Sequence, residues 1–235
     1  RIRAAGSGRR ISYEGSPSVL FRAGQVFVQV YFRRGDTLLA RFLGKMYEKS
    51  MKVLKTDIPG VCIVEPSVFG DSRGYFFESY NAREFESAVG DVRFVQDNES
   101  FSTYGVVRGL HFQKGEWAQA KLVRVVRGRI WDVCVDLRKG SPTFGKWMGV
   151  ELSGENHRQL FIPRGLAHGF SVLSPDALFQ YKCDNFYAPE SAGSIDALDV
   201  TLGIDWHIKE EDMVRSEKDL KAPLFEALSG DSFYD

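Results

Sequence analysis

From residue 51 onward, short apolar segments alternate with turn-forming residues in a pattern typical of β-rich proteins. Residues 131–138 alternate apolar and polar side chains with the period of two of a β-strand. Arg127-Gly128 separates this segment from the apolar run at residues 121–126, which predicts a hairpin-like join between two strands. Further strand-like runs occupy Gln159–Ile162, His168–Leu173 and Ala177–Tyr181.

Helical signals in this region are confined to two segments. Residues 81–89 predict one short helix, and residues 216–228 predict a second that is broken at Pro223. Turn-forming residues at 139–143 and 153–156 separate neighbouring strand-like runs. Many short strands joined by such turns predict an all-β fold, a cupin-like double-stranded β-helix (jelly roll) with a few short helices.

The first fifty residues differ in composition from the rest of the chain. They are rich in Arg and Gly, and contain ten Lys or Arg against three Asp or Glu. One β-like run, residues 26–32, lies among them. The segment could be an organelle transit peptide, an ordered arm, or sequence upstream of a natural start at Met51, which we favour. We therefore predict a basic extension at 1–50 outside the core and a jelly-roll domain at 51–235.

Charge and cysteine content restrict the partners and the compartment. The whole chain has a formal net charge of zero, so the region after residue 50 is acidic, which argues against a nucleic-acid partner. The apolar stretch at residues 19–32 is too short and too interrupted to span a membrane. Cys62, Cys134 and Cys183 show no CxxC spacing, so we expect buried free thiols. These features predict a cytoplasmic protein without a membrane partner.

Two histidines lie in segments that could meet inside a barrel. His111 follows Arg108-Gly-Leu, and His168 ends a Pro-x-Gly-x-x-His pattern that is half of the metal-cupin signature. Metal cupins usually carry a second His where this chain has Gln113, and the nearest following acid, Glu116, lies in a polar turn. Because two imidazoles alone seldom hold a divalent ion, we expect no metal. Either histidine could instead be structural, His168 more readily than His111.

Several other side chains have both a functional and an ordinary interpretation. Lys121 could stabilise an enolate oxygen or extend to water. Tyr181 and Tyr187 could supply a phenolic proton donor and a stacking ring, or could only pack. Asp132 could orient His168 or face solvent, and alternation does not decide between these. Arg73 and Arg108 flank glycines and could bind a pyrophosphate or remain surface residues.

Seven short strings, taken together, resemble the dTDP-4-dehydrorhamnose 3,5-epimerase family. They are Asp71–Glu78, Phe94–Asn98, Arg108–Gln113, Lys121–Arg124, Ser141–Gly145, Ile162–Phe170 and Ser216–Asp219. They occur in the family's order and spacing across almost all of residues 51–235, whereas residues 1–50 have no counterpart. The resemblance implies an isomerase of dTDP-L-rhamnose biosynthesis that acts on a dTDP-linked 4-keto-6-deoxy sugar, needs no cofactor and forms a homodimer.

The resemblance also implies roles for individual residues. His111 resembles the catalytic base with Asp219 as its carboxylate partner, and Tyr181 resembles the acid on the opposite face. Lys121 resembles the cation that stabilises the enolate, and Asp132 is implied to support His168. The residues that match substrate-binding positions are Arg73, Glu78, Gln96, Asp97, Asn98, Arg108, His168, Tyr187, which is implied to stack on thymine, and Lys218.

Three positions depart from the family pattern. Ala192 stands where the family has a substrate-contacting Glu, although Glu190 is close by; Phe186 replaces a Tyr, and Leu198-Asp199 replaces Asn-Asp. The first change leaves open whether one or both carbons are epimerised. Three alternatives remain. They are an epimerase that inverts a single carbon of a related 4-keto sugar nucleotide, a non-catalytic sugar-nucleotide-binding cupin and a metal-dependent cupin oxygenase.

Overall fold

The computed structural model describes residues 18–23, 26–31, 51–228, 230 and 233–234, and the chain divides into two units, 1–49 and 50–235. In the first unit, β1 (Ser18–Ala23) and β2 (Val26–Tyr31) pair as antiparallel strands. The β-like run that starts at residue 26 is therefore a strand, although its last residue, Phe32, lies outside the described residues. The assignment of residues 1–50 to an extension remains a prediction.

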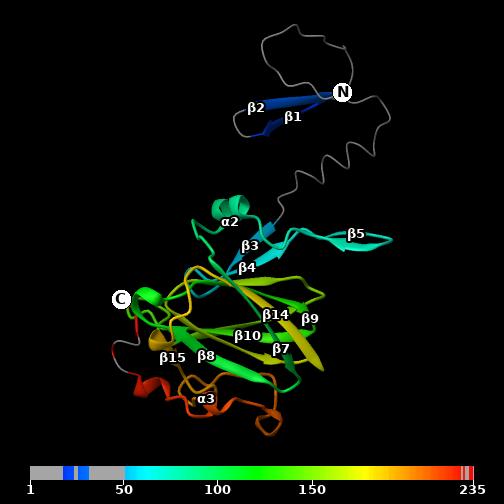
Figure 1. The fold of residues 1–235 in the computed structure, drawn as a ribbon. Coiled ribbons are helices and arrows are strands. Elements are labelled where there is room, and N and C mark those ends of the chain that lie inside the picture. The colour runs from blue at the N-terminus through cyan, green and yellow to red at the C-terminus, as the bar shows by residue number, and fades with distance from the viewer. Residues whose placement is uncertain (1–17, 24–25, 32–50, 229, 231–232, 235) are drawn as a thin grey trace. The chain divides into compact units, whose positions relative to one another are not determined.

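The second unit consists mainly of two antiparallel sheets (Figure 1). The five-stranded sheet has the order β11 (Trp147–Ser153), β10 (Arg129–Asp136), β13 (Leu166–Val172), β8 (Val107–Gln113) and β15 (Ala192–Ser194). The six-stranded sheet has the order β3 (Met51–Lys55), β4 (Cys62–Pro66), β12 (Gln159–Ile162), β9 (Lys121–Arg127), β14 (Asp176–Cys183) and β7 (Gln96–Thr103). The predicted all-β, jelly-roll-like fold is confirmed.

The predicted hairpin at Arg127-Gly128 is wrong. Strands β9 and β10 flank this turn, but they belong to different sheets: β9 pairs with β12 and β14, and β10 pairs with β11 and β13. Gly128 has a φ of +83°, and a Cβ there would clash with the carbonyl oxygen of Asp176. The chain therefore uses a glycine to cross between sheets, whereas the sequence pattern shows only that two strands are separated by a short turn.

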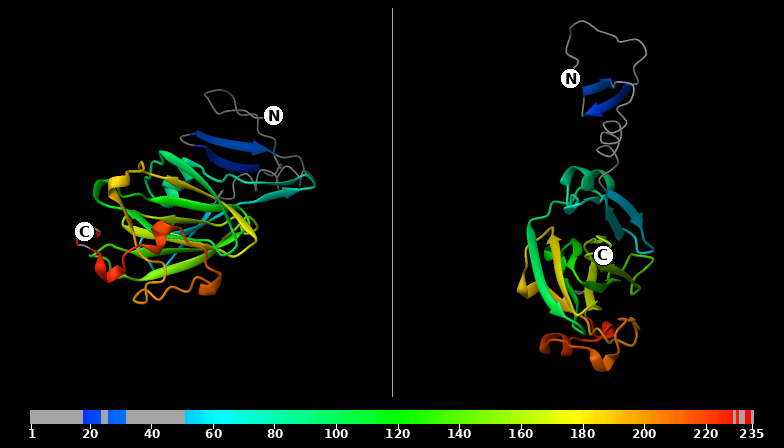
Figure 2. Two further views of the ribbon diagram at one scale, coloured as in Figure 1. Left: turned by 60° about the horizontal axis from the view of Figure 1, so that its bottom comes forward. Right: turned by 90° about the vertical axis from the view of Figure 1, so that its right-hand side faces the viewer.

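Strand β10 is buried on both faces. Ile130 and Cys134 belong to the core between the two sheets, with residues of β9, β12 and β14. Val133 and Val135 belong to a second core, in which residues of the C-terminal part of the chain such as Trp206 cover the outer face of the five-stranded sheet. Figure 2 shows this orange and red C-terminal segment along one side of the sandwich. Asp132 and Asp136 are therefore buried, despite their alternation with apolar residues, whereas Arg129 at the start of the strand is exposed.

Helices are few and short, as predicted. Helix α2 (Ala82–Ala88) begins after Asn81, whose side chain caps the backbone N–H of Glu84. Helix α3 (Glu217–Leu220) ends before Pro223, and a 3₁₀ turn follows it at Phe225–Ala227. Other short elements are the β5 (Phe69–Asp71) and β6 (Gly74–Phe76) hairpin and 3₁₀ turns at Gly115–Trp117, Pro189–Ser191 and Glu210–Asp212.

Two further expectations concern the cysteines and the membrane. Cys62, Cys134 and Cys183 are all buried free thiols, as expected from their spacing. Within the described residues, none of the helices has the length and apolar character needed to cross a membrane.

Candidate active site

A cavity of about 450 Å³ opens between the two sheets beside α3. It receives side chains from β7, β8, β9 and β14, so residues that are far apart in the sequence meet in one place. Three of the four predicted catalytic side chains, His111, Lys121 and Tyr181, line it directly. The lining residues are Gln96, Asn98, His111, Phe112, Gln113, Gln119, Lys121, Tyr181, Tyr187, Ala192, Gly193 and Lys218.

The fourth predicted catalytic residue, Asp219, reaches His111 from outside the sheet. His111 Nε2 lies 2.6 Å from Asp219 Oδ1, and the backbone N–H of Asp219 is capped by Ser216 at the start of α3. The His111 side chain is 41% exposed whereas that of Asp219 is 4% exposed. Burial lowers the pKa of His111, and the hydrogen bond that His111 donates to Asp219 opposes this shift. The imidazole thus faces the cavity with one nitrogen already held by a carboxylate.

A second His–Asp pair lies deeper in the same sheet. His168 is the cross-strand partner of His111 in the β13–β8 ladder, and its Nε2 lies 3.0 and 3.1 Å from the two carboxylate oxygens of Asp132. The Asp132 side chain is fully buried, and that of His168 is 8% exposed. Burial raises the pKa of Asp132, against the lowering effects of His168 and Lys121. Asp132 therefore does contact His168 and does not face solvent.

Lys121 and Tyr181 have shifted pKa values in opposite directions. Burial lowers the pKa of Lys121, whose ammonium forms no hydrogen bond or ion pair with any described residue. Burial also raises the pKa of Tyr181, and the nearby charge of Arg108 partly offsets that effect. A lysine that is poorly solvated and a tyrosine that stays protonated suit the stabilisation of an oxyanion and the donation of a proton, respectively.

Hydrogen bonds connect several of the polar residues that line the cavity. Gln96 Nε2 donates to Asn98 Oδ1 at 3.0 Å, and Asn98 Nδ2 donates to the Cys183 sulfur at 3.7 Å. The backbone N–H of Tyr187 donates to Gln96 Oε1 at 3.1 Å, and the Tyr187 ring is exposed. Gln96, Asn98 and Tyr187 were all predicted site residues, and the structure brings them together.

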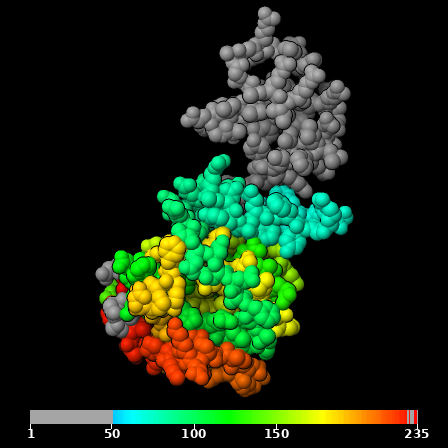
Figure 3. Space-filling view, viewed as in Figure 1, coloured from blue at the N-terminus to red at the C-terminus, as the bar shows by residue number. Residues whose placement is uncertain are grey.

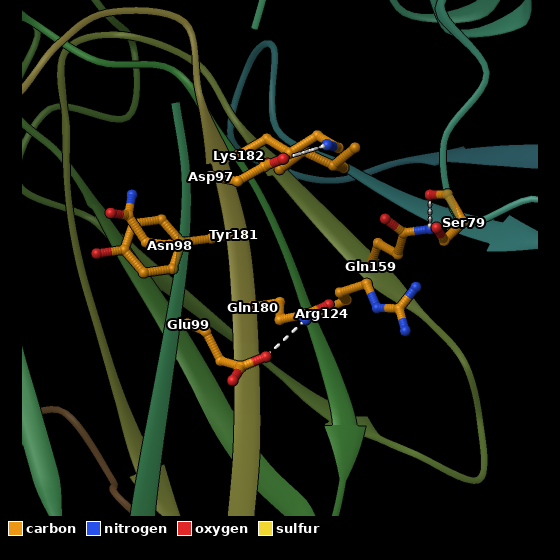
Figure 4. Close-up of a pocket in the computed structure, with 10 residues that line it drawn as sticks. Ser79, Asp97, Asn98, Glu99, Arg124, Gln159, Gln180, Tyr181 and Lys182 are labelled. Carbon is orange, nitrogen blue, oxygen red and sulfur yellow. Dashed lines mark hydrogen bonds and ion pairs between the residues drawn. The ribbon is translucent and has the colours of Figure 1, made fainter. Parts of the chain in front are cut away.

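Asp97 lies on the opposite face of the sheet from its two neighbours. In Figure 4, Tyr181 and Asn98 point to one side of β14 and β7, whereas Asp97 and Lys182 point to the other and form an ion pair at 2.9 Å. This outer face contains a smaller cavity, of about 230 Å³, lined by Asp97, Glu99, Arg124, Gln180 and Lys182 among others. Because side chains alternate along a strand, three consecutive residues cannot all face the His111 cavity.

The predicted binding arginines also differ in position. Arg73 lies on the β5–β6 hairpin, which projects from the sandwich (Figures 1 and 3), and pairs with Asp71 at 2.6 Å. Glu78 is exposed and accepts a hydrogen bond from Asn81. Neither residue lines the cavity in this chain. Arg108 donates to Ser102 Oγ at 3.0 Å and acts electrostatically on Tyr181, whereas Lys218 lines the cavity.

The site and its immediate surroundings include residues beyond those predicted from the sequence. Cys183 is the cross-strand partner of both Lys121 and Gln96, so its buried thiol lies among the site residues. From the sequence, Gln113 stands out only as the residue in place of a metal cupin's second histidine, and Gln119 carries no signal. Both lie near predicted residues on β8 and β9, and the period of two, counted from His111, would have pointed to Gln113.

The described part of the chain contains no group of three or more His, Cys, Asp or Glu side chains placed to hold a metal ion. The His111 cavity instead presents one half-exposed imidazole, two lysines and two tyrosines, with amide side chains beside them. This set can move protons and stabilise an oxyanion.

Comparison with known proteins decides the family. The sequence profile of dTDP-4-dehydrorhamnose 3,5-epimerase matches residues 55–227. The chain belongs to this family. It is accordingly an isomerase, an epimerase of the dTDP-rhamnose pathway. The Salmonella typhimurium dTDP-4-dehydrorhamnose 3,5-epimerase is 56% identical over 177 residues, which cover 75% of this chain and 96% of that protein.

Solved structures of epimerases agree with this assignment. The Elizabethkingia anophelis dTDP-4-dehydrorhamnose 3,5-epimerase superposes with a TM-score of 0.71 at 57% identity and covers 75% of this chain and 97% of its own. The Legionella pneumophila epimerase, solved in complex with dTDP-4-keto-L-rhamnose, gives a TM-score of 0.76 at 49% identity, with 78% and 97% coverage. A 3′-monoepimerase from Streptomyces bikiniensis in complex with dTDP-quinovose is also similar, with a TM-score of 0.67, 36% identity and 72% and 85% coverage.

Proposed function

We propose that the His111 cavity inverts carbons 3 and 5 of dTDP-4-dehydro-6-deoxyglucose to give dTDP-4-dehydrorhamnose. The observation that carries this proposal is the convergence of His111, Lys121 and Tyr181 on one cavity, with Asp219 hydrogen-bonded to His111. A hydrogen on a carbon next to a ketone is acidic, because the resulting anion delocalises onto the ketone oxygen. The cavity supplies a base, a cation and an acid for this chemistry.

In the proposed mechanism, His111 removes the proton from a carbon beside the C4 ketone. The C–H bonding electrons form the enolate double bond, and the negative charge develops on the C4 oxygen, where Lys121 stabilises it. Tyr181 then donates its proton to the opposite face of the same carbon, which inverts the configuration. A positioned base contributes about 10²–10⁴-fold to such a step, and a fixed oxyanion partner roughly 10²–10³-fold.

The pKa directions support these roles. Because burial lowers the pKa of His111, its imidazole is neutral at neutral pH and can accept a proton. Asp219 accepts the Nε2 proton of this neutral ring, which leaves the lone pair on Nδ1 for the substrate. Because burial raises the pKa of Tyr181, its phenol is protonated and can act as the acid. Asp132 and His168, which are buried behind the cavity, are proposed to support this arrangement.

The polar residues that line the cavity near Tyr187 are proposed to bind the nucleotide. Gln96, Asn98 and Lys218 offer amide and ammonium groups to the pyrophosphate and base, and the exposed Tyr187 ring is available to stack on thymine. The structure of the Bacillus anthracis epimerase, 45% identical to this chain, contains TDP and pyrophosphate, which supports a nucleotide ligand for this chain.

We also propose that the protein is a homodimer. Arg73 and Glu78, two predicted substrate-binding residues, do not line the cavity of their own chain. Tyr75 and Phe76, on the same hairpin, expose most of their surface. A second copy whose hairpin enters this cavity would bury those rings and complete the site. The cytoplasmic location remains a prediction, supported by the three buried free thiols.

NMR of the 4-keto sugar nucleotide incubated with the protein in deuterated water tests the proposed reaction. Deuterium at carbons 3 and 5, together with the rhamno product, is expected. Exchange and inversion at one carbon only would instead indicate a monoepimerase, an alternative that Ala192 at the family's Glu position leaves open. Binding without exchange at either carbon would contradict catalysis and indicate a binding protein.

A further inference from the structure

Gln113 is a buried side chain of the cavity with no role in the proton transfers. It is 5% exposed and lies on β8, two residues after His111. Its Nε2 donates to the carbonyl oxygens of Trp117 at 2.6 Å and Phe186 at 3.0 Å, and its Oε1 accepts from the backbone N–H of Ala188 at 2.7 Å. Both amide N–H groups and the amide oxygen are therefore used by the backbone.

Two of these hydrogen bonds hold the residues on either side of Tyr187. Phe186 offers its carbonyl and Ala188 its N–H to the same amide, so Gln113 fixes the peptide units before and after Tyr187. The N–H of Tyr187 itself is held by Gln96. The Tyr187 ring, by contrast, is 58% exposed at the cavity. The backbone of this residue is thus fixed while its ring stays free to meet a ligand.

The chemical identity of the side chain matters at this position. It must donate to two carbonyl oxygens and accept from one N–H, a combination that a primary amide meets in full. A neutral imidazole has one donor and one acceptor, and a carboxylate has no donor. Glutamine at the position of the second histidine of metal cupins therefore has a structural purpose of its own here.

We propose that Gln113 is a positioning residue that preorganises Tyr187 for the nucleotide base, an inference that rests on the proposed stacking role of Tyr187. A ring whose backbone is already ordered loses less conformational entropy when a ligand binds. Without Gln113, the 186–188 segment would lose two hydrogen bonds, and buried backbone groups left unpaired would favour other conformations. The nucleotide would then bind a ring that is in place for only a fraction of the time.

The test is a double-mutant cycle on the full chain, with dTDP as the ligand in calorimetric titrations. Gln113→Met keeps the length of the side chain and removes all three hydrogen bonds. We expect dTDP to bind about tenfold more weakly or worse, and KM to rise similarly while kcat at saturation changes by less than about threefold. In a Tyr187→Ala background the same substitution should have almost no further effect on dTDP affinity.

Asn156→Leu is the matched control. Asn156 also makes three side-chain hydrogen bonds to backbone, to Glu151, Ser153 and Arg158, in a turn whose residues do not line the cavity. Its loss should lower the Tm and leave dTDP affinity unchanged. If Gln113→Met does not fold, Gln113→Glu, which keeps the acceptor for Ala188 and loses both donors, enters the same cycle.

Additive effects of Gln113 and Tyr187 on dTDP affinity would overturn the proposal, as would a fall in kcat with unchanged affinity. Both results leave the proposed epimerase activity standing, because wild-type exchange in deuterated water is measured separately. Conversely, a wild type that binds dTDP but exchanges no deuterium refutes the proposed reaction and leaves the cycle interpretable.

Discussion

The two His–Asp pairs of the five-stranded sheet use the same chemistry in different surroundings. His111 and His168 are cross-strand neighbours, and each imidazole is hydrogen-bonded through Nε2 to a carboxylate. His111 is 41% exposed to the cavity, whereas His168 is 8% exposed. The partner of His111 comes from α3, and the partner of His168 comes from the adjacent strand β10. Only the first pair has a free side to meet a substrate.

Strand β14 places a different side chain beside each of the two His–Asp pairs. Tyr181 lines the cavity with His111, whereas Phe179, two residues earlier, stacks on His168 with ring centroids 6.1 Å apart. The ring centroids of Phe179 and Tyr181 lie 5.5 Å apart. The His111–Asp219 pair therefore has the hydroxyl of Tyr181 nearby, whereas the His168–Asp132 pair has an apolar ring. Exposure and the neighbouring side chain, more than the His–Asp hydrogen bond, distinguish a catalytic pair from a supporting one.

The largest effect is expected from removing each imidazole in turn. His111→Ala should leave the fold intact and lower kcat by about 10²–10⁴-fold, the contribution of a positioned base. His168→Ala should instead leave the buried Asp132 unpaired and destabilise the fold by about 3–5 kcal/mol. Turnover of the purified, folded variants and their urea unfolding curves measure the two effects. Near-normal turnover of a well-folded His111→Ala protein would contradict the comparison.

Tyr181→Phe gives the His111–Asp219 pair an apolar neighbouring ring, like the one beside His168. Packing should change little, because only a hydroxyl is lost, and His111 can still remove a proton. Reprotonation from the opposite face should fail, so the enolate is requenched from the His111 side with the original configuration. In deuterated water we expect continued exchange at carbon 3 or 5 with a sharp drop in epimer formation. Equal loss of exchange and inversion would assign Tyr181 to binding or enolate stabilisation.

The pH dependence of kcat/KM for exchange should show which carboxylate, that of Asp219 or that of Asp132, acts on His111. Because burial lowers the pKa of His111, the acid limb of kcat/KM for exchange should have its inflection below 6.5, and activity should fall as His111 becomes protonated. The Asp219 hydrogen bond opposes that shift, so Asp219→Asn should move the inflection to lower pH. Asp132→Asn should leave it in place. An inflection that moves with Asp132 and not with Asp219 would reverse the assignments.

Much of this site could be predicted because its residues lie in recognisable strings. His111, Lys121, Tyr181 and Asp219 were placed by resemblance, and the structure brings them to one cavity. Asp97 is different: it lies inside such a string, yet alternation directs it to the other face of β7. A resemblance identifies a segment, whereas strand geometry decides which of its side chains reach the cavity.

Long-range arrangement is what the local pattern could not provide. Alternation at 131–138 correctly predicts a strand, but it does not show that the C-terminal segment covers the outer face and buries both sides. Likewise Arg127-Gly128 separates two strands, and only the pairing of β10 with β13 shows that the chain changes sheet there. The position of Arg73 away from the cavity depends on how the hairpin projects, which is a tertiary property.

The smallest effect is expected in the pH dependence of stability at the buried pair. The pKa of Asp132 is raised above 3.8 by burial, so in this range the folded state binds a proton more tightly than the unfolded state. Its stabilising contribution is full below about 3.8 and is lost as the pH rises through the raised value.

Asp132→Asn keeps an oxygen for His168 and has no such titration, so its Tm relative to wild type should increase from pH 4 to pH 7. Each pKa unit corresponds to about 1.4 kcal/mol, or roughly 3–6 °C in a domain of this size. Scanning calorimetry of wild type and Asp132→Asn at both pH values measures the difference. Parallel Tm curves for wild type and Asp132→Asn would show that the buried carboxyl does not titrate as its surroundings require.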